Sequence, residues 1–391
     1  MTNREHFFAL VRGKQPHVLS WLMAFFNERV ATELLGAHNV PADVIPTADW
    51  NFGASDRADW DAKVRYAQAT GNCAAGVGWG TCIAFGHGGP GEFRDRLTEA
   101  GPQHRLSIYE TGVKKEVRRD PHFYQHFDYP VRSRADWERL ALPDPDDPAR
   151  YRGIADEAAF YRQHDLIAYA NLNGFFSGIH YFLYPYDELL ADLILDPGFV
   201  QAMLERLGAW NLLAAENLLR CGVDVLTFCD DLGSGRSLLM RPALYRRFFL
   251  PWHSQLADLC HRYGALLHMH SHGNINLILP DLAAAGIDLL NPNDPDEGMD
   301  LPALKRAFGD RITFVGGLHK KFFAWDYAEQ QRFIRRLVAD AGGGLILMDA
   351  GGVPEGFSKA QFDRLMALFA EIKGKSDADE RGQARISKDL P

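Results

Sequence analysis

The stretch that decides the fold is Ala265-Leu-Leu-His-Met-His270, a short apolar run that ends in polar residues. A helical pattern precedes it over Pro242–Tyr263, and another follows it over Ile275–Ala285. An apolar run of this length without strict alternation is typical of a strand that is buried on both faces of a parallel sheet. The stretch therefore predicts a buried strand between two covering helices.

The same strand–helix unit recurs through the second half of the chain. Further short apolar runs are Leu166–Leu172, Asp224–Phe228, Ile287–Leu290, Ile312–Val315 and Leu345–Met348. Helical patterns between the runs include Asp187–Leu195, Pro197–Leu219, Asp300–Phe308 and Ala328–Ala341. Strand–helix alternation that continues for about 200 residues indicates a parallel sheet with covering helices.

The first half of the chain is less regular. Val18–Met23 is a candidate first strand after an opening helix over His6–Arg12, and Gly71–Gly91 is expected to form loops and short strands. Ile108–Val117 and His126–Pro130 are typical of an antiparallel excursion. The whole pattern predicts an α/β fold, a (β/α)8 TIM barrel with N-terminal helical and loop elaborations.

A doubly wound open sheet is the alternative fold. It would require a glycine-rich phosphate loop after an early strand, whereas Gly86–Gly91 contains a proline and follows no clear strand–helix unit. We therefore expect one barrel domain over residues 1–375. Residues 376–391 are charged and poor in apolar groups, so we expect them to form a flexible tail.

The composition excludes several classes of protein. Of the 391 residues, 47% are hydrophobic and 24% are charged, as in a soluble globular protein. The net charge of −9 argues against a nucleic-acid-binding protein, and no apolar run approaches the roughly 20 residues of a membrane span. The cysteines are odd in number, at five, and form no C-x-x-C pair. Because no signal-peptide pattern is present either, we expect a cytoplasmic enzyme without disulfides.

The most distinctive motif is His268-Met-His-Ser-His-Gly273. Side chains two residues apart on a strand share one face, so His268, His270 and His272 are expected on the same side. At the carboxyl end of a barrel strand they would lie at the mouth, where barrel enzymes place their active sites. Either the imidazoles bind a metal ion, or they form hydrogen bonds without a metal.

Polar residues end the other predicted strands as well. They are Asn171 and Asn173, Cys229–Asp231, Asn291–Asp294, His319–Lys321 and Asp349. Asp294 and Asn274 are expected to cap the helices that follow them. The remaining carboxylates and imidazoles are suited to acid–base chemistry, so Asp231, His319 and Asp349 are candidate catalytic residues.

Other candidates concern the substrate. Arg236, in the loop after Asp231, is a candidate to hold a substrate carboxylate. Aromatic residues are dense after Asn173, where Phe175 and Tyr181 could contact a flat substrate. Asn173 and Asn291, at two strand ends, complete this candidate set.

A group of motifs is specific in combination. It comprises Tyr129–Leu140 with Pro143–Pro148, Asp230–Ser234 followed by Pro242 and Tyr245, His270–Ile275, Gly286–Pro292, Met299–Leu301 with Leu304 and Lys305, Phe308–Arg311, and Val315–Gly317. With these motifs, most of residues 1–375 resembles the uroporphyrinogen decarboxylase superfamily, which also contains corrinoid-dependent and cobalamin-independent methyltransferases. The resemblance implies a (β/α)8 barrel and a homodimer, but it does not determine the reaction.

The sequence departs from the true tetrapyrrole decarboxylases of that superfamily. These carry an R-Q-A-G-R-Y segment after the first strand, whereas Trp21–Arg29 lacks the paired arginines here. Their late G-H-G-I motif is replaced by Ala350–Val353. Uroporphyrinogen is therefore not the expected substrate, and Trp21 is a candidate contact for a different small molecule.

The methyltransferase branch binds zinc through an H-x-C-G motif and a late cysteine. His270 matches the first ligand, His272 replaces the first cysteine, and Gly351 stands at the position of the second. The resemblance therefore implies zinc, or another divalent transition metal, on His270 and His272 without a thiolate. Further ligands would come from this set: His268, His319, Asp349, Asp231 or Glu355.

The expected activity follows from that replacement. Neutral imidazoles leave a metal ion more electrophilic than thiolates do, which favours a substrate that meets the metal through oxygen. Within the superfamily this implies a metal-assisted methyltransferase of the demethylase type, which moves a methyl group from a small O- or N-methylated substrate to a corrinoid protein. The alternative is a decarboxylase or other lyase acting on a small carboxylated or aromatic substrate.

Overall fold

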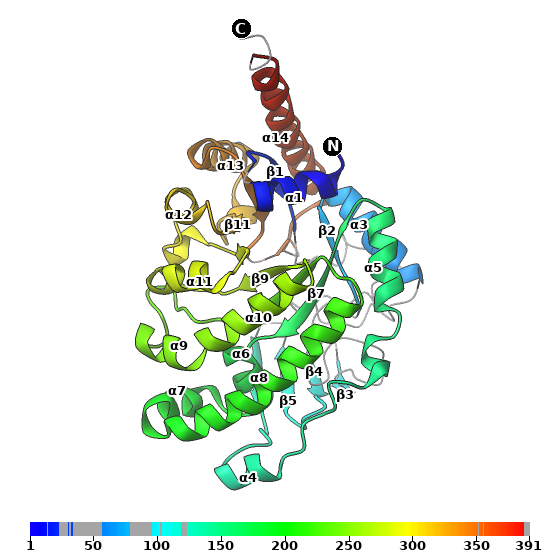
Figure 1. Cartoon of the computed structure of the whole chain (residues 1–391). Helices are drawn as coiled ribbons and strands as arrows, with labels where there is room; N and C mark the ends of the chain where they lie inside the picture. Colours follow the sequence, from blue (N-terminus) through cyan, green and yellow to red (C-terminus); the bar gives the residue numbers. More distant parts are fainter. Residues whose placement is uncertain are drawn as a thin grey trace.

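The computed structural model describes residues 1–13, 15–22, 30, 33, 57–78, 96–101, 104–118, 123–350, 352–354 and 356–386. A parallel sheet of eight strands forms its centre, in the order β1-β12-β11-β10-β9-β8-β7-β2 (Figure 1). The strands are β1 (Val18–Ser20), β2 (Ala74–Gly76), β7 (Ile167–Asn173), β8 (Val225–Cys229), β9 (Leu266–His270), β10 (Leu289–Asn291), β11 (Thr313–Gly317) and β12 (Leu345–Met348). The predicted runs of the second half thus all form strands, with ends shifted by at most two residues.

The two outermost strands of this order meet and close the sheet. Ser20 and Asn72 form a parallel bridge, and the amide of Cys73 donates to the carbonyl of Ser20 at 2.9 Å. The Asn72 side chain pairs with the backbone of Leu22, since its Oδ1 accepts from the Leu22 N–H at 2.9 Å and its Nδ2 donates to the Leu22 carbonyl at 2.8 Å. The predicted barrel is therefore confirmed, and the open doubly wound sheet is excluded.

Helices follow the strands and cover the outside of the barrel (Figure 1). The α-helices are α1 (Asn3–Gly13), α3 (Arg57–Thr70), α4 (Arg134–Arg139), α5 (Ile154–Gln163), α6 (Phe176–Phe182), α7 (Tyr186–Leu195), α8 (Pro197–Arg220), α9 (Pro242–Phe248), α10 (Leu250–Arg262), α11 (Leu279–Ala285), α12 (Leu301–Phe308), α13 (Tyr327–Ala341) and α14 (Lys359–Ile386). Short 3-10 turns are η3 (Pro148–Tyr151), η4 (Asn276–Ile278), η5 (Pro295–Glu297) and η6 (Phe322–Ala324).

The helix expected over Pro242–Tyr263 is in fact two helices. Helix α9 ends at Phe248, and α10 begins at Leu250 with Pro251 in its first turn. Proline has no N–H to donate to the carbonyl four residues earlier, so one continuous helix would lose a hydrogen bond here. The break lies between Tyr245 of α9 and His253 of α10, whose side chains contact each other.

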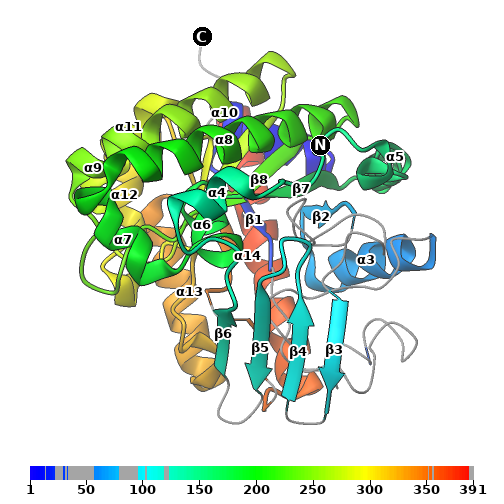
Figure 2. The same cartoon turned by 90° about the horizontal axis from the view of Figure 1, so that it is seen from below.

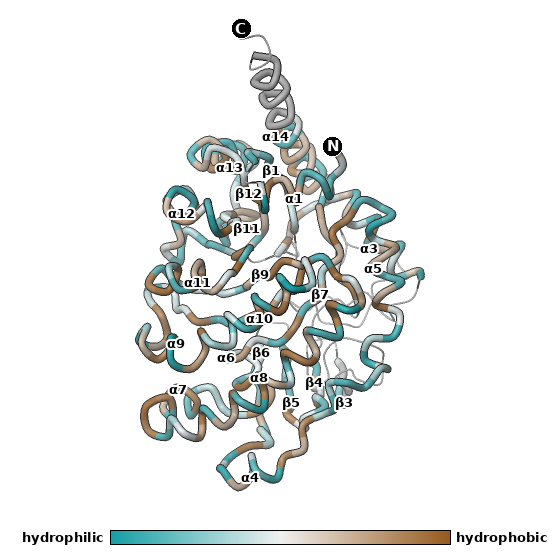
Figure 3. Tube along the Cα trace, viewed as in Figure 1, coloured by the Kyte–Doolittle hydropathy of each residue, from teal (hydrophilic) through white to brown (hydrophobic). Residues whose placement is uncertain are grey.

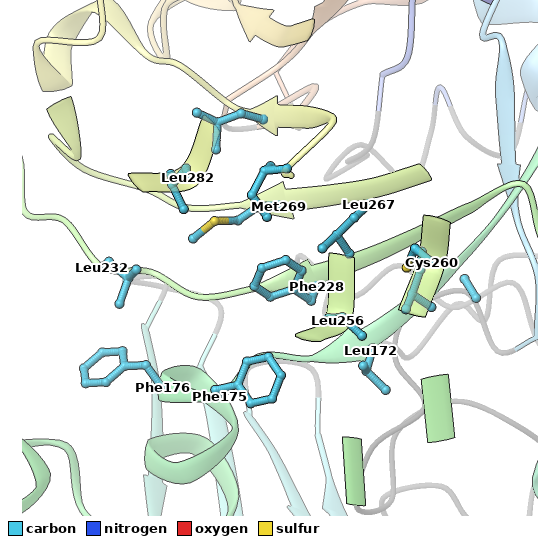
Figure 4. Packing of buried hydrophobic residues seen from close by; sticks show 14 of the residues in the cluster. Leu172, Phe175, Phe176, Phe228, Leu232, Leu256, Cys260, Leu267, Met269 and Leu282 are labelled. Atoms are coloured by element: carbon cyan, nitrogen blue, oxygen red, sulfur yellow. The ribbon is translucent and has the colours of Figure 1, made fainter. Parts of the chain in front are cut away.

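Two apolar regions hold the fold together. The larger lies between the outer face of the sheet and the helices, where Phe175, Phe228, Leu256 and Met269 pack closely (Figure 4). The smaller fills the inside of the barrel and is capped by residues of α1 such as Phe7. Along the chain, the helices alternate between hydrophobic and hydrophilic positions, as expected for helices with one buried face (Figure 3).

A separate four-stranded antiparallel sheet projects from the barrel (Figure 2). Its strands, in order, are β3 (Arg96–Ala100), β4 (His104–Ile108), β5 (Lys114–Arg118) and β6 (Phe123–Phe127). The predicted antiparallel excursion is confirmed, and it has more strands than the two segments suggested. Its last strand contacts α6, because His126 lies against Tyr181 with ring centroids 5.0 Å apart.

The last helix extends into the expected tail. Helix α14 continues to Ile386, so residues 376–386 are helical, and their mobility stays a prediction. The helix extends away from the barrel (Figure 1). Across the described ranges of the chain, no helix is long and apolar enough to cross a membrane.

Candidate functional site

Four neighbouring strands end in one row of polar side chains. The register pairs Asn173 with Cys229, Cys229 with His270, and His270 with Asn291. Paired residues of parallel strands point to the same face, so all four side chains face the barrel interior at its carboxyl end. The predicted convergence of strand ends is confirmed for β7 to β10.

Three donors come together in this row and just beyond it. The ligand atoms of Cys229, Asp231 and His270 all lie within 4.8 Å of one another. His270 Nε2 is 3.7 Å from Asp231 Oδ1, and both side chains are partly exposed. We call these three residues the Cys-Asp-His cluster. Cys229 forms no disulfide.

The imidazole of His270 is oriented by its neighbour on β10. The amide nitrogen of Asn291 lies 3.1 Å from His270 Nδ1. Rotation of the Asn291 amide by 180° would place its oxygen at this position, where it accepts a hydrogen bond from Nδ1–H of His270. The unprotonated Nε2 then faces Asp231 with a free lone pair, which a metal ligand requires. Burial and the nearby His272 lower the pKa of His270 to about 4, against the opposing effect of Asp231. The ring is therefore neutral near pH 7.

His272 lies beside the cluster and has a different partner. Its Nδ1 is 3.6 Å from Glu297 Oε2, and its ring stands nearly perpendicular to that of His270. Burial lowers the pKa of His272, but Glu297 and Asp231 outweigh this effect and raise it overall. The backbone N–H of His272 donates to Asp231 Oδ1 at 2.8 Å, which fixes that carboxylate.

A buried hydrogen-bond chain lies behind the cluster. Asp230 accepts from the backbone N–H groups of Phe175 at 3.1 Å and Ser177 at 2.8 Å. Its Oδ2 is 2.9 Å from His253 Nε2, and His253 Nδ1 is 3.0 Å from the Tyr245 hydroxyl. Burial and the charge of Asp230 raise the pKa of Tyr245, so its hydroxyl keeps its proton and donates to His253. Sequence reasoning missed this chain, although Asp230 and Tyr245 belong to the motifs quoted above.

Aromatic residues of α6 and β6 lie on the side of the cluster nearest the antiparallel sheet. Burial raises the pKa of Tyr181 well above its ordinary value, and the charges of Asp231 and Cys229 add to this effect. The same hydroxyl pairs with Tyr124 of β6. Tyr181 therefore lies near the cluster, and its contact with a substrate stays a prediction. His180 is buried behind it, and burial lowers the pKa of His180 to about 4.

Below the row, the barrel interior contains His268. Its ring is fully buried, 5.1 Å from the ring of Trp21, and its Nδ1 is 3.3 Å from the Thr227 hydroxyl. Trp21 also packs on Tyr169, with centroids 4.7 Å apart. Burial lowers the pKa of His268 to about 3. His268 shares the face of His270, as expected, but lies one layer deeper than the cluster.

Several predicted residues lie apart from the cluster. Phe175 is fully buried in the outer core, against Trp252 and His253. Arg236 is exposed at the tip of a turn that a bridge between Gly233 and Leu238 closes. Their roles as substrate contacts stay predictions.

The remaining candidates belong to other strand ends. His319 Nε2 is 2.7 Å from Asp296 Oδ1. Asp349, after β12, is buried and accepts from the N–H of Gly352 at 2.8 Å. Glu355 lies outside the described residues. Asp294 caps η5 by accepting from the Asp296 N–H, as expected. The expectation is wrong for Asn274, because the N-cap of η4 is Ile275; the Asn274 Oδ1 accepts locally from the Asn276 N–H at 3.2 Å.

The Cys-Asp-His cluster adds Cys229 to the expected ligand set. The resemblance implied His270 and His272 without a thiolate, and His272 stays a predicted ligand, with its ring centroid 4.8 Å from that of His270. The register across strands places Cys229 beside His270. In the sequence, Cys229 and Asp231 at the end of the preceding strand could have indicated this cluster.

The residues present fit a zinc ion. Thiolate, carboxylate and imidazole are the three ligand types that zinc prefers. Ligand atoms of a tetrahedral zinc site are separated by roughly 3.5 Å, close to the 3.7 Å between His270 and Asp231. Three protein ligands with a further open position are typical of catalytic rather than structural zinc.

Comparisons with known proteins agree with this architecture. The family model for uroporphyrinogen decarboxylase (URO-D) matches residues 112–372. A methyltransferase from Methanosarcina mazei superposes with a TM-score of 0.64 at 14% identity, covering 95% of this chain and 99% of that one. A B12-independent methionine synthase from Shewanella sp. W3-18-1, in complex with selenomethionine, has a TM-score of 0.49 at 10% identity, covering 93% and 99%. No curated protein sequence matches the chain significantly.

The family match extends over about two thirds of the chain and includes β7 to β12, which supply the row of strand ends and the cluster. The methyltransferase from Methanosarcina mazei shares the fold at low identity, so it adds support for the barrel alone. The chain belongs to the uroporphyrinogen decarboxylase family.

Proposed function

We propose that this protein is a metal-dependent methyltransferase of the demethylase type. It would take a methyl group from a small O- or N-methylated substrate and pass it to a corrinoid protein. The observation that carries the proposal is the Cys-Asp-His cluster, three ligands of different chemistry at the mouth of a barrel. Mouth-facing clusters at the carboxyl ends of barrel strands are where this fold places its chemistry.

A divalent ion bound there would act as a Lewis acid on the oxygen or nitrogen that bears the methyl group. The neutral ring of His270 is available as a ligand near pH 7. The Tyr181 hydroxyl retains its proton, so it could donate a hydrogen bond to the heteroatom that is left behind. Asp231 is held by the backbone of His272, which keeps its carboxylate in place for the metal.

The presence of a thiolate modifies the expected chemistry of the metal. One sulfur ligand makes the ion softer than an all-imidazole site would, while a carboxylate and an imidazole keep it suited to oxygen and nitrogen donors. The proposal therefore retains O- and N-methylated substrates and does not depend on a substrate carboxylate. The exposed position of Arg236 gives no support to a carboxylate anchor at the cluster.

The test is methyl transfer with the metal-loaded protein. Protein purified without chelators and loaded with zinc is mixed with cob(I)alamin and a panel of methyl ethers and methylamines. Formation of methylcobalamin, followed by absorbance, should require zinc and be lost in Cys229→Ser. Release of carbon dioxide from carboxylated substrates, with no corrinoid present, would instead indicate the lyase. Zinc-independent activity of either kind would contradict the metal proposal.

A further inference from the structure

The hydrogen-bond chain behind the cluster joins helix α10 to the residue between two cluster members. The Tyr245 hydroxyl donates to His253 Nδ1, and this fixes the proton of His253 on Nε2, which faces Asp230 Oδ2 at 2.9 Å. All three side chains are buried away from solvent. A buried carboxylate requires such donors, because an unpaired charge in this environment is strongly destabilising.

Asp230 is fixed through its backbone as well as its side chain. Its N–H donates to the carbonyl of His270 at 2.9 Å, which ties β8 to β9 directly at the cluster. In the sequence it separates Cys229 from Asp231, so these two donors point to the opposite side. The Asp230 carboxylate and the two donors therefore belong to one short segment at the end of β8.

Asp230 and the backbone of Cys229 pack tightly against Gly174, just before α6. A Cβ added at Gly174 would lie 1.9 Å from the carbonyl oxygen of Cys229 and 2.1 Å from Asp230 Oδ1. Ser177 accepts a hydrogen bond from the Asp231 N–H through its hydroxyl, at 3.2 Å. A shift of the Asp230 carboxylate is thus transmitted both to the cluster and to α6, the helix that carries Tyr181.

We propose that His253 is a positioning residue for the metal site, acting through Asp230 from outside the barrel. It holds the carboxylate in the one orientation that satisfies the amides of α6 and presents Cys229 and Asp231 together. The inference rests on the proposed function, since it assigns His253 to the same metal site. Residues that orient metal ligands from behind typically change metal affinity by about 10- to 100-fold when they are replaced.

The test compares His253→Phe with two matched variants. His253→Gln retains a side-chain donor, and His261→Phe changes an exposed histidine of the same helix that pairs with Asp288. Cobalt(II) replaces zinc as the probe, because its visible spectrum reports coordination geometry and thiolate ligation. We expect His253→Phe to bind cobalt about 10-fold or more weakly with an altered spectrum, His253→Gln to recover part of the affinity, and His261→Phe to match the wild type.

A metal-free measurement separates this inference from the proposed function. The rate at which Cys229 is alkylated in the apo protein, read by mass spectrometry of its peptide, should change several-fold in His253→Phe and not in His261→Phe. An unchanged alkylation rate together with an unchanged cobalt spectrum and affinity would overturn the positioning role. If the wild type binds no cobalt, the metal proposal fails, and the alkylation rates alone then decide whether His253 positions Cys229.

Discussion

Replacement of His180 by phenylalanine should make the protein less sensitive to acid. Burial lowers the pKa of His180 to about 4, against an ordinary value of 6.5, and the nearby carboxylates of Asp231 and Asp230 offset only part of this effect. The ring packs against Phe176 and Tyr181, with centroids 5.0 Å and 4.1 Å away, so phenylalanine suits its surroundings. The variant removes one titrating group with little change in packing.

The sign and size follow from proton linkage. In the unfolded chain His180 binds a proton as the pH falls below 6.5, whereas in the folded protein it does so only near pH 4. The folded state therefore loses stability as the pH falls from 6.5 to about 4. At about pH 5 the loss from this one group is about 2 kcal/mol, since each pH unit corresponds to about 1.4 kcal/mol. For a chain of this size that equals a difference of about 2 °C in melting temperature.

The assay has two parts. Calorimetry at about pH 7 and about pH 5 should show that the melting temperature of the wild type falls by about 2 °C more than that of His180→Phe. NMR of the histidine ring protons should show no titration of His180 above about pH 5. His261→Phe is the control of opposite sign, because the hydrogen bond to Asp288 raises the pKa of His261. Equal acid sensitivity of His180→Phe and the wild type, or titration of His180 near pH 6.5, would refute the argument.

Three further predictions concern the cluster and its frame. Cys229→Ser should abolish the thiolate-to-cobalt absorption, whereas Cys260→Ser, which changes a buried cysteine of α10, should leave the cobalt spectrum unchanged. Gly174→Ala places a Cβ 1.9 Å from a backbone oxygen, so it should lower the free energy of unfolding by about 3 kcal/mol or more in chemical denaturation. Gly235→Ala is its control and should be neutral, because an added Cβ there has nothing within 4 Å. Lys373→Met removes hydrogen bonds of its ammonium group at the barrel seam between β1 and β2, and should lower stability by about 1–3 kcal/mol; an unchanged denaturation midpoint would show that the seam does not depend on them.

The barrel and much of its mouth could be predicted from the sequence. Apolar runs such as Leu345–Met348 stand out because a strand covered by helices must be apolar along its whole length. The same rhythm placed His270 and Asn291 at strand ends, and parallel strands bring their carboxyl ends to one edge. The break between α9 and α10 was missed because the helical pattern continues across Pro251.

The composition of the cluster was decided by tertiary structure. Alternation along one strand predicts which residues share a face, so it placed His268 and His270 together, but it says nothing about the register between strands. Only the pairing of β8 with β9 brings Cys229 beside His270, and only the packing of α10 places His253 behind Asp230. These contacts join residues far apart in the chain. The sequence alone determined the barrel through its local hydrophobic period, and the folded register decided which donors meet at its mouth.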